Sequence, residues 1–401
     1  MYRFIIAVAL CAVWAASAHA AGFAMHEFGA RGNALCGAMV ARPATDPSSI
    51  AFNPALVTHL DTPQVLAGVT MVQPEVTIDT PGESTTTEAN VWAIPHAYAT
   101  TPLTDTMYFG VGAFPRFGLG NEYSKTWPMA SELTYVGIQS VSVNPVLGFR
   151  PTKGFAFGFG VEAMYFDFEE KMRPLGMDAR IKGDSTGFGL NGGMWWQAFD
   201  DVALGASFRT PVKQHVKGRA TFDNVPAGYG PLFRDTDAEG DITLPGEVRF
   251  GVYWQATERL GVEVGAMRTF WSSYDELRID YGSPVGGKPA SIKQTEWEDV
   301  WRLSAGAEYR LTDNVDLRAG YVYDEEPVNS AHLDFMVPAN DRHLMSLGVG
   351  YHEGPWRVDL SYTYLLITDR EGEVHTAGGH VPVRFHDGYA HLLGMSAAWE
   401  F

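Results

Sequence analysis

The sequence predicts an all-β protein, a 14-stranded antiparallel transmembrane β-barrel that is plugged by an N-terminal hatch. Three observations carry this prediction. Apolar and polar residues alternate with period two in many segments, which is the pattern of strands with one apolar face. The chain begins with a candidate export signal. It ends on an aromatic residue, Phe401, that belongs to an alternating segment rather than to a tail.

Residues 1–20 are predicted to be a signal peptide. A short positive region (1–3) is followed by an apolar, uncharged run (4–16), and Ala18-His19-Ala20 fits the small-x-small cleavage rule. A membrane anchor is the weaker alternative, because the run is shorter than the roughly 20 residues that a spanning helix needs. Cleavage would leave Cys36 as the one remaining cysteine, so we expect no intramolecular disulfide.

Residues 21–63 are predicted to form the hatch. This segment lacks strand alternation, and three prolines (Pro43, Pro47 and Pro54) stand within 12 residues, which argues against a strand. A disordered tail is the alternative, but the segment holds many apolar residues and such tails hold few. A barrel of this size is too wide to be filled by its own side chains, so it needs a plug or is an open pore.

Residues 64–401 are predicted to be the transmembrane barrel. In 356–366, for example, the even positions are aromatic or aliphatic and the odd positions are mostly polar. A soluble β-sandwich also alternates, but aromatic residues near the strand ends and charges on the polar face favour a membrane barrel. No segment after the signal reaches about 18 apolar residues, which excludes a helical membrane protein. The expected strands are 64–79, 90–103, 106–118, 135–150, 154–171, 181–199, 201–217, 241–257, 260–275, 290–310, 314–325, 341–353, 355–369 and 386–401.

The links between the expected strands are of two kinds. Short turns such as 200–201 and 257–258 alternate with long links such as 218–240 and 276–289. Short turns at one end and long loops at the other are typical of an outer-membrane barrel.

The composition excludes several classes of protein. With 13% aromatic and only 19% charged residues the chain is unlike a disordered protein, and two cysteines are too few for a disulfide scaffold. The formal net charge of −18 argues against a nucleic-acid partner.

Several segments, in order along the chain, resemble one family. They are Ala21-Gly22-Phe23, the segment 46–55 with its Asn-Pro-Ala ending, 117–120, 204–212 and 318–321. Together they resemble the FadL-like (Toluene X, OmpP1) outer-membrane transporters of long-chain fatty acids and hydrophobic compounds. The resemblance runs over the whole mature length. It implies a monomer in the bacterial outer membrane that contacts outer-membrane lipid and is inserted by the barrel assembly machinery.

The resemblance also implies a passive route. Long-chain fatty acids or aromatic hydrocarbons would enter an outer groove, move to an inner pocket and leave sideways at a kinked third strand. Carried over, Asn53, Pro54 and Ala55 of the hatch would face the kink near Gly118. Glycine can take backbone angles that break strand pairing, and proline cannot donate to a strand ladder.

The link 114–135 is the candidate outer groove. It holds Phe114, Phe117, Trp127 and Leu133 among other apolar residues, which is unusual for an exposed loop. We also expect a short helix over 124–133. A loop that folds on itself is an equally open alternative use of these residues.

Three cations are candidates for binding a fatty-acid carboxylate. By resemblance, Lys293 falls at a basic position of the family, Arg173 lies within one residue of a second, and Arg116 neighbours a third contact region. The alternative for each is a lumen charge paired with an acid. If the pocket lacks a working cation, neutral hydrocarbons become the better substrate.

We expect no catalytic residue, metal or cofactor. Residues 183–187 match the G-x-S-x-G pattern, but a nucleophile elbow needs a following helix and a strand pattern follows here, so we interpret them as a turn. Residues 158–160 are interpreted as a glycine-rich strand, and the histidines lack zinc-site spacing. Two alternative functions stay open: a general diffusion porin and, third, an outer-membrane lipase that uses Ser185.

Overall fold

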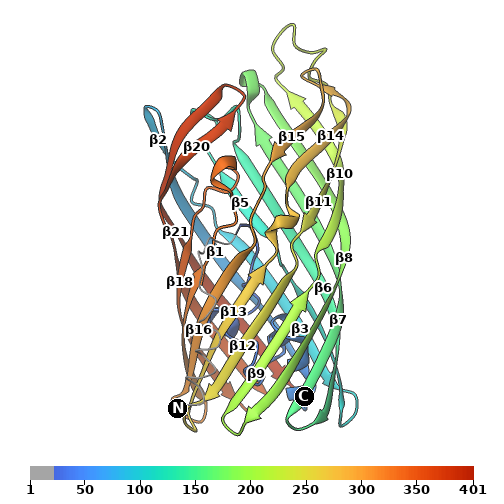
Figure 1. The fold of residues 1–401 in the computed structure, drawn as a ribbon, viewed down its shortest axis with the longest axis vertical. Coiled ribbons are helices and arrows are strands. Elements are labelled where there is room, and N and C mark those ends of the chain that lie inside the picture. The colour runs from blue at the N-terminus through green and yellow to red at the C-terminus, as the bar shows by residue number, and fades with distance from the viewer. Residues whose placement is uncertain (1–21) are drawn as a thin grey trace.

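The computed structural model describes residues 22–401 and forms a closed antiparallel barrel of 14 strands (Figure 1). The predicted signal peptide lies outside the described residues. Within them, no helix is both long and apolar enough to cross a membrane. The barrel closes where the first strand pairs with the last, from Gln64 opposite Glu400 to Asp79 opposite Arg384.

Six of the barrel strands are interrupted, so the sheet contains 21 strand segments. The interrupted strands are β4/β5, β9/β10, β11/β12, β13/β14, β15/β16 and β19/β20, and β2 is a short hairpin extension of β1. The bounds are β1 (Gln64–Thr80), β2 (Glu83–Thr86), β3 (Trp92–Pro102), β4 (Met107–Phe114), β5 (Gly118–Glu122), β6 (Tyr135–Thr152), β7 (Phe155–Met172), β8 (Asp178–Phe199), β9 (Val202–Arg209), β10 (Val212–Asp223), β11 (Thr236–Leu244), β12 (Glu247–Gln255), β13 (Leu260–Thr269), β14 (Glu276–Val285), β15 (Lys288–Gln294), β16 (Val300–Arg310), β17 (Val315–Asp324), β18 (Arg342–Glu353), β19 (Trp356–Ile367), β20 (Arg370–Thr376) and β21 (Gly379–Glu400).

The strand number predicted from the sequence is confirmed, but some bounds are wrong. The expected long link 276–289 is a hairpin made by β14 and β15, and β10, β11 and β21 extend further than expected. These parts lie at the barrel end that carries the long links, here called the outer end (Figure 1). Beyond the lipid the outward face of a strand meets water and can be polar, whereas the apolar side chains of β14 (Leu277, Ile279 and Tyr281) pack on the interior.

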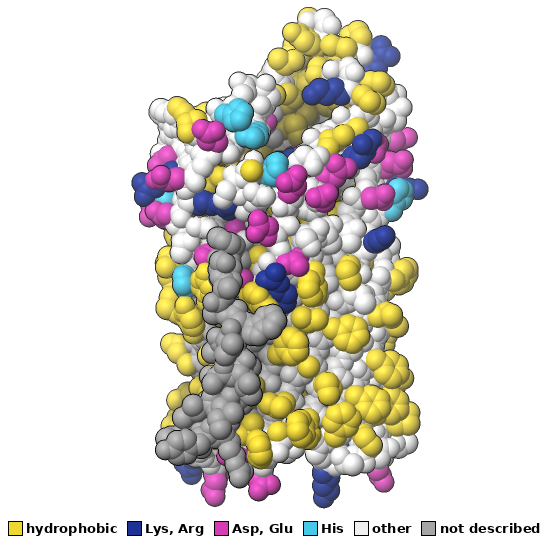
Figure 2. Space-filling view, viewed as in Figure 1, with side chains coloured by type: hydrophobic (Ala, Val, Ile, Leu, Met, Phe, Trp, Pro, Cys, Tyr) yellow, Lys and Arg dark blue, Asp and Glu magenta, His cyan; other side chains and the backbone are white. Residues whose placement is uncertain are grey.

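The outside of the barrel carries an apolar belt. Phe188, Leu347 and Leu393 point outward and are 75%, 65% and 60% exposed. Figure 2 shows hydrophobic side chains over the middle and lower parts of the visible face, with most charged side chains above them and a few at the bottom edge. This distribution is that of a transmembrane barrel with an outward lipid-facing band.

The N-terminal segment, residues 22–63, lies inside the lower half of the barrel (Figure 1). It forms three short helical pieces, α2 (Ala30–Ala34), η1 (Pro47–Ala51) and η2 (Pro54–His59). Asp46 and Asn53 cap η1 and η2 by accepting hydrogen bonds from Ser48 N and Ala55 N, at 2.9 and 3.0 Å. Each cap is followed by proline at the first helical position, where its missing N–H costs nothing.

Glycines of the barrel wall allow the N-terminal segment to approach closely. A Cβ on Gly306 would lie 2.6 Å from Leu35 O, and one on Gly320 would lie 2.7 Å from the carbonyl carbon of the same residue. The glycine-rich inner face therefore belongs to a crowded lumen.

Buried ion pairs tie the segment to the wall. Arg31 contacts Asp46 at 3.3 Å and Glu308 of β16 at 3.0 Å. Glu263 of β13 accepts hydrogen bonds from the backbone N–H groups of Val40 and Arg42, at 2.6 and 2.7 Å. Charges buried in this way need partners, so the segment and the wall depend on each other.

Candidate functional site

The third barrel strand is broken, and the break opens the wall. β4 pairs with β3 on one side and with β6 on the other. β5 pairs with β6, but in the described chain none of its residues pairs with β3. Residues 92–96 of β3 therefore keep β1 as a neighbour but have no strand on their other edge. We call this opening between β3 and β5 the lateral gap.

The residues of the break are held by one serine. Pro115 has no N–H to donate, and the N–H groups of Arg116 and Phe117 both donate to Ser140 Oγ, at 3.2 and 2.9 Å. Ser140 Oγ donates in turn to Phe117 O at 2.8 Å. The hydroxyl of Ser140 thus takes the place of a neighbouring strand for the backbone groups of Arg116 and Phe117. Sequence reasoning missed it, because an inward serine on β6 carries no signal by itself.

The start of the N-terminal segment meets the break. Met25 N donates to Arg116 O at 2.8 Å and Gly118 N donates to Phe23 O at 3.0 Å, so Ala24 and Phe117 stand opposite each other as an antiparallel bridge. A Cβ on Gly118 would overlap Met25 Sδ, so a larger residue here would displace the Met25 side chain.

The expected partner of Gly118 was wrong. Asn53, Pro54 and Ala55 lie against β7 and β8 instead of the break. Asn53 Nδ2 donates to Met194 O at 2.9 Å, and a Cβ on Gly158 would lie 2.7 Å from Pro54 O. The wall glycines that admit this motif are therefore on β7 and β8.

A cavity of about 730 Å³ lies behind the lateral gap. We call it the inner cavity. Both edges of the gap line it, with 91–97 on one side and 117–121 on the other, and residues 22–27 form part of its boundary. Most of its lining is aliphatic or aromatic, and its polar lining includes His26, Glu27, Arg302, Asp324 and Arg342.

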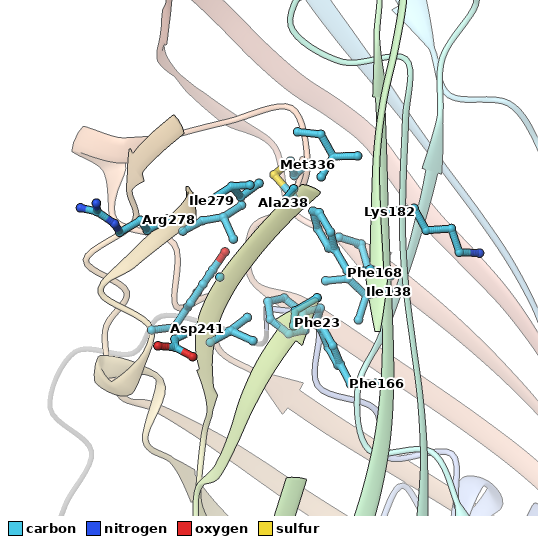
Figure 3. A pocket seen from close by; sticks show the side chains of 18 of the residues that line it. Phe23, Ile138, Phe166, Phe168, Lys182, Ala238, Asp241, Arg278, Ile279 and Met336 are labelled. Carbon is cyan, nitrogen blue, oxygen red and sulfur yellow. The ribbon is translucent and has the colours of Figure 1, made fainter. Parts of the chain in front are cut away.

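A second, smaller cavity of about 50 Å³ lies toward the outer end (Figure 3). We call it the outer cavity. Its lining includes Phe166, Phe168 and Ile279, and Figure 3 shows the charged ends of Lys182 and Arg278 turned away from it. The outer cavity is thus almost wholly apolar.

Phe23 lines both cavities, as do Leu119, Ile138 and Val337. Its ring packs against Trp271, Trp297 and Tyr274, with centroids 4.8, 5.5 and 5.8 Å away, and against Phe117 at 6.1 Å. Of the four shared residues, Phe23 belongs to the N-terminal segment, and its backbone is held at the break of the third strand.

Comparison with known proteins identifies the family. The family model described as "Outer membrane protein transport protein (OMPP1/FadL/TodX)" matches residues 11–401. The chain belongs to this family. It is 24% identical to the long-chain fatty acid transport protein of Escherichia coli strain K12, over 90% of each chain, and 25% identical to outer membrane protein P1 of Haemophilus influenzae strain Rd, over 88% of this chain and 87% of that one.

Solved structures share the fold. A FadL homologue of Pseudomonas aeruginosa matches with a TM-score of 0.83 at 18% identity, covering 96% of this chain and 100% of that one. The toluene transporter TodX of P. putida matches with a TM-score of 0.75 at 17% identity, covering 94% and 99%. As a FadL-family member, the chain is an outer-membrane β-barrel protein.

The four predicted groove residues of this FadL-family chain fall into different places. Phe117 lines the inner cavity. Phe114 is fully buried nearer the inner end, where its ring packs on Phe28 and Tyr98, 5.1 and 5.7 Å away. Trp127 and Leu133 are buried in the link itself, where Trp127 Nε1 donates to Leu133 O at 2.6 Å. These contacts favour a loop that folds on itself for 124–133, and Phe114 is not a groove residue.

The helix expected over 124–133 is wrong. The segment forms successive turns, and Pro128 stands in its middle. Proline lacks an N–H and disfavours the helical conformation of the residue before it, so a regular helix cannot run through this point.

The three predicted cations of the FadL resemblance are all paired with acids. Lys293 Nζ lies 2.9 Å from Asp334, Arg173 Nε lies 3.0 Å from Asp178, and Arg116 Nη1 lies 2.9 Å from Glu162. Asp334 lines the outer cavity, but none of the three cations lines either cavity. Their role in carboxylate binding stays a prediction, and the pairing that we named as the alternative is present at each.

The sequence motif around Ser185 has no helix after it. Residues 183–187 lie within β8, so they are a strand rather than the turn that we expected, and Ser185 Oγ donates to Gln214 Oε1 at 2.9 Å. Residues 158–160 lie in β7, as predicted. Among residues 22–401 no group of three or more His, Cys, Asp or Glu side chains is arranged to hold a metal ion.

Glu326 should make the stability of the protein pH-dependent. It lies in the link between β17 and β18, is 3% exposed, and its Oε2 is buried without a hydrogen-bond partner. Burial raises the pKa of its carboxyl from 4.5 to about 8. Because the folded chain holds this proton more tightly than the unfolded chain does, the folded state loses stability as the pH rises from about 4.5 to about 8.

We therefore expect Glu326→Gln to raise the melting temperature in detergent by about 3 °C at pH 9 and to leave it unchanged at pH 5. Glu296→Gln, at an exposed position of the link before β16, serves as the control and should have no such effect. An equal gain at both pH values would show that the effect is not ionisation of Glu326.

Proposed function

We propose that the protein is a passive uptake channel for hydrophobic molecules, either long-chain fatty acids or aromatic hydrocarbons. These are the substrate classes in the names of its relatives, a long-chain fatty acid transport protein and a toluene transporter. The molecule enters the outer cavity, passes Phe23, occupies the inner cavity and leaves through the lateral gap into outer-membrane lipid. An apolar molecule gains from this route because it never needs to cross the aqueous space below the barrel.

One observation carries the proposal: both edges of the lateral gap line the inner cavity. An apolar chamber that opens through the wall at membrane height can exchange an apolar molecule with lipid. Phe23 is the gate in this proposal, and residues 21–63 act as the hatch that keeps the inner end closed. The chain works as a monomer after insertion by the barrel assembly machinery.

The alternatives account for less of the structure. A general diffusion porin needs a water-filled lumen, whereas the buried pairs of Arg31 with Asp46 and Glu308 hold the N-terminal segment inside. A lipase would use Ser185, whose hydroxyl is engaged by Gln214 in the middle of a strand. The relatives are transport proteins, which also supports a protein without catalytic activity.

Closing the lateral gap should stop uptake. A Cβ on Gly120 would overlap the indole ring of Trp92 across the gap, so these two positions face each other. We expect a short bismaleimide cross-link between Trp92→Cys and Gly120→Cys to lower the uptake of radiolabelled oleate and toluene at least about ten-fold in intact cells. Cys36 is replaced by serine in all variants to avoid a side reaction.

The matched control is the same cross-link between Ala99→Cys and Val111→Cys, a directly opposed pair where β3 and β4 are hydrogen-bonded strands. That cross-link leaves the gap open, so uptake should persist. Full uptake after the Trp92–Gly120 cross-link, at a yield verified by mass spectrometry, would contradict the lateral route.

A further inference from the structure

Two arginines contribute positive charge to the lining of the inner cavity. Arg302 projects from β16 and Arg342 from β18, and both line the cavity. They donate to the same oxygen, Oδ2 of Asp324, at 2.5 and 3.0 Å. Asp324 lies on β17 between them and is 2% exposed, so the strand pairing itself holds the two guanidinium groups side by side.

Around these arginines the lining holds more donors than acceptors. Each guanidinium carries five N–H donors, and one carboxylate is shared between the two. Arg302 is 8% exposed, and Arg342 Nε is buried without a hydrogen-bond partner. His26 Nδ1, in the N-terminal segment, is also buried and unpartnered. The two other acids of the lining already accept hydrogen bonds, Glu27 from His26 N at 2.9 Å and Glu75 from Tyr389 OH at 3.0 Å.

The three cations predicted from the sequence differ from this pair. Lys293, Arg173 and Arg116 each have a carboxylate close by and lie outside the cavity linings. Arg302 and Arg342 share one carboxylate and face the cavity. A second carboxylate would restore one acid per arginine. It could accept a hydrogen bond from an arginine N–H group that Asp324 leaves free, and a hydrogen bond between such charged groups is strong.

The remainder of the cavity is suited to a long apolar chain. It reaches the lateral gap, and Val72, Trp92 and Val141 contribute to the lining. A volume of about 730 Å³ is within the range of sites for small lipids. A pair of arginines in a lining that is otherwise mostly aliphatic or aromatic matches a single-chain amphiphile better than a small neutral hydrocarbon.

We propose that Arg302 and Arg342 form a carboxylate subsite that seats a long-chain monocarboxylate with its hydrocarbon chain directed at the lateral gap. This inference rests on the proposed uptake function and specifies the substrate class of the inner cavity. It also sets the direction of release, because the chain reaches the lipid before the carboxylate leaves the arginines.

The test compares oleate with oleyl alcohol, which has the same chain and a neutral head. Binding to the purified full-length protein is measured by displacement of a fluorescent fatty alcohol. We expect Arg342→Gln to weaken oleate binding about ten-fold and to leave oleyl alcohol binding unchanged. Arg302→Gln should act in the same way. Arg219→Gln, which removes an exposed cation of β10 outside both cavity linings, should change neither.

The outcomes separate this proposal from the broader one. Unchanged binding of oleyl alcohol shows that a variant retains a folded cavity. If Arg342→Gln and Arg302→Gln leave oleate binding unaltered, or weaken oleate and oleyl alcohol equally, the carboxylate subsite is wrong and the channel can still stand. If wild-type cells take up neither oleate nor toluene better than cells without the protein, the channel itself is wrong.

Discussion

A disulfide between Ala24→Cys and Phe117→Cys should abolish uptake, and reduction should restore it. Ala24 and Phe117 are the two residues of the isolated antiparallel bridge between the N-terminal segment and the break of the third strand. The flanking hydrogen bonds make them a non-hydrogen-bonded pair, the type in which the side chains approach most closely. Such a pair meets the distances that a disulfide needs.

The expected effect is large because the bond immobilises the neighbour of Phe23. Phe23 lines both cavities and packs on four aromatic rings, and in the proposed route its ring moves to let a substrate pass. With residue 24 bonded to the barrel wall, we expect oleate and toluene uptake to fall at least about ten-fold under oxidising conditions. A membrane-permeant reductant should return it to the level of the reduced double variant.

Two single variants control for the substitutions themselves. Ala24→Cys alone is nearly isosteric and should transport normally, and Phe117→Cys alone measures the loss of one aromatic ring. Cys36 is buried in the same segment and is replaced by serine throughout. If the fully oxidised double variant transports as fast as its reduced form, Phe23 does not act as a moving gate.

Removal of residues 22–60 should convert the barrel into an open pore. The deleted residues fill the inner half of the lumen, and a 14-stranded barrel without them is too wide for its own side chains to close. We expect single-channel conductance in planar bilayers to rise at least about ten-fold. Glu263 loses its partners in the deleted segment and Glu308 keeps, of its described ion pairs, only the one with Arg318 of β17, but water enters the lumen and hydrates both.

This deletion also tests the porin alternative. A diffusion porin would conduct strongly as the full-length chain and would change little after the deletion. Folding of the variant is checked by its heat-modifiable mobility in detergent gels, with the full-length chain as reference. A large conductance that is equal in both proteins would favour the porin and contradict the hatch.

Much of the architecture could be predicted from the sequence. Each of the 14 expected strands, for example 356–366, alternates because one face meets lipid and the other meets a polar lumen. The number of strands therefore follows from a local pattern. The proline-rich segment that begins at Pro43 could be recognised as irregular for an equally local reason. Strand ends beyond the lipid were harder to predict. In β14 the residues 276–281 do alternate, with Leu277, Ile279 and Tyr281 packed on the interior, but we expected a link there, and β15 has no such alternation.

The site was less predictable, because it depends on pairing between distant residues. Gly118 lies at the break, but the residue that stands against it is Met25 rather than Asn53. The cations chosen by resemblance are neutralised by Asp334, Asp178 and Glu162, and the arginines that face the inner cavity carry no local signal.

By itself the sequence determined the fold class and the number of strands, since each rests on a pattern within a few neighbouring residues. The tertiary structure alone decided where the wall opens, that Phe23 lines both cavities, and that Arg302 and Arg342 share Asp324. The physical reason is register. In a closed barrel the pairing of each strand with its neighbours decides which side chains share a cavity, and that pairing joins residues far apart in the chain.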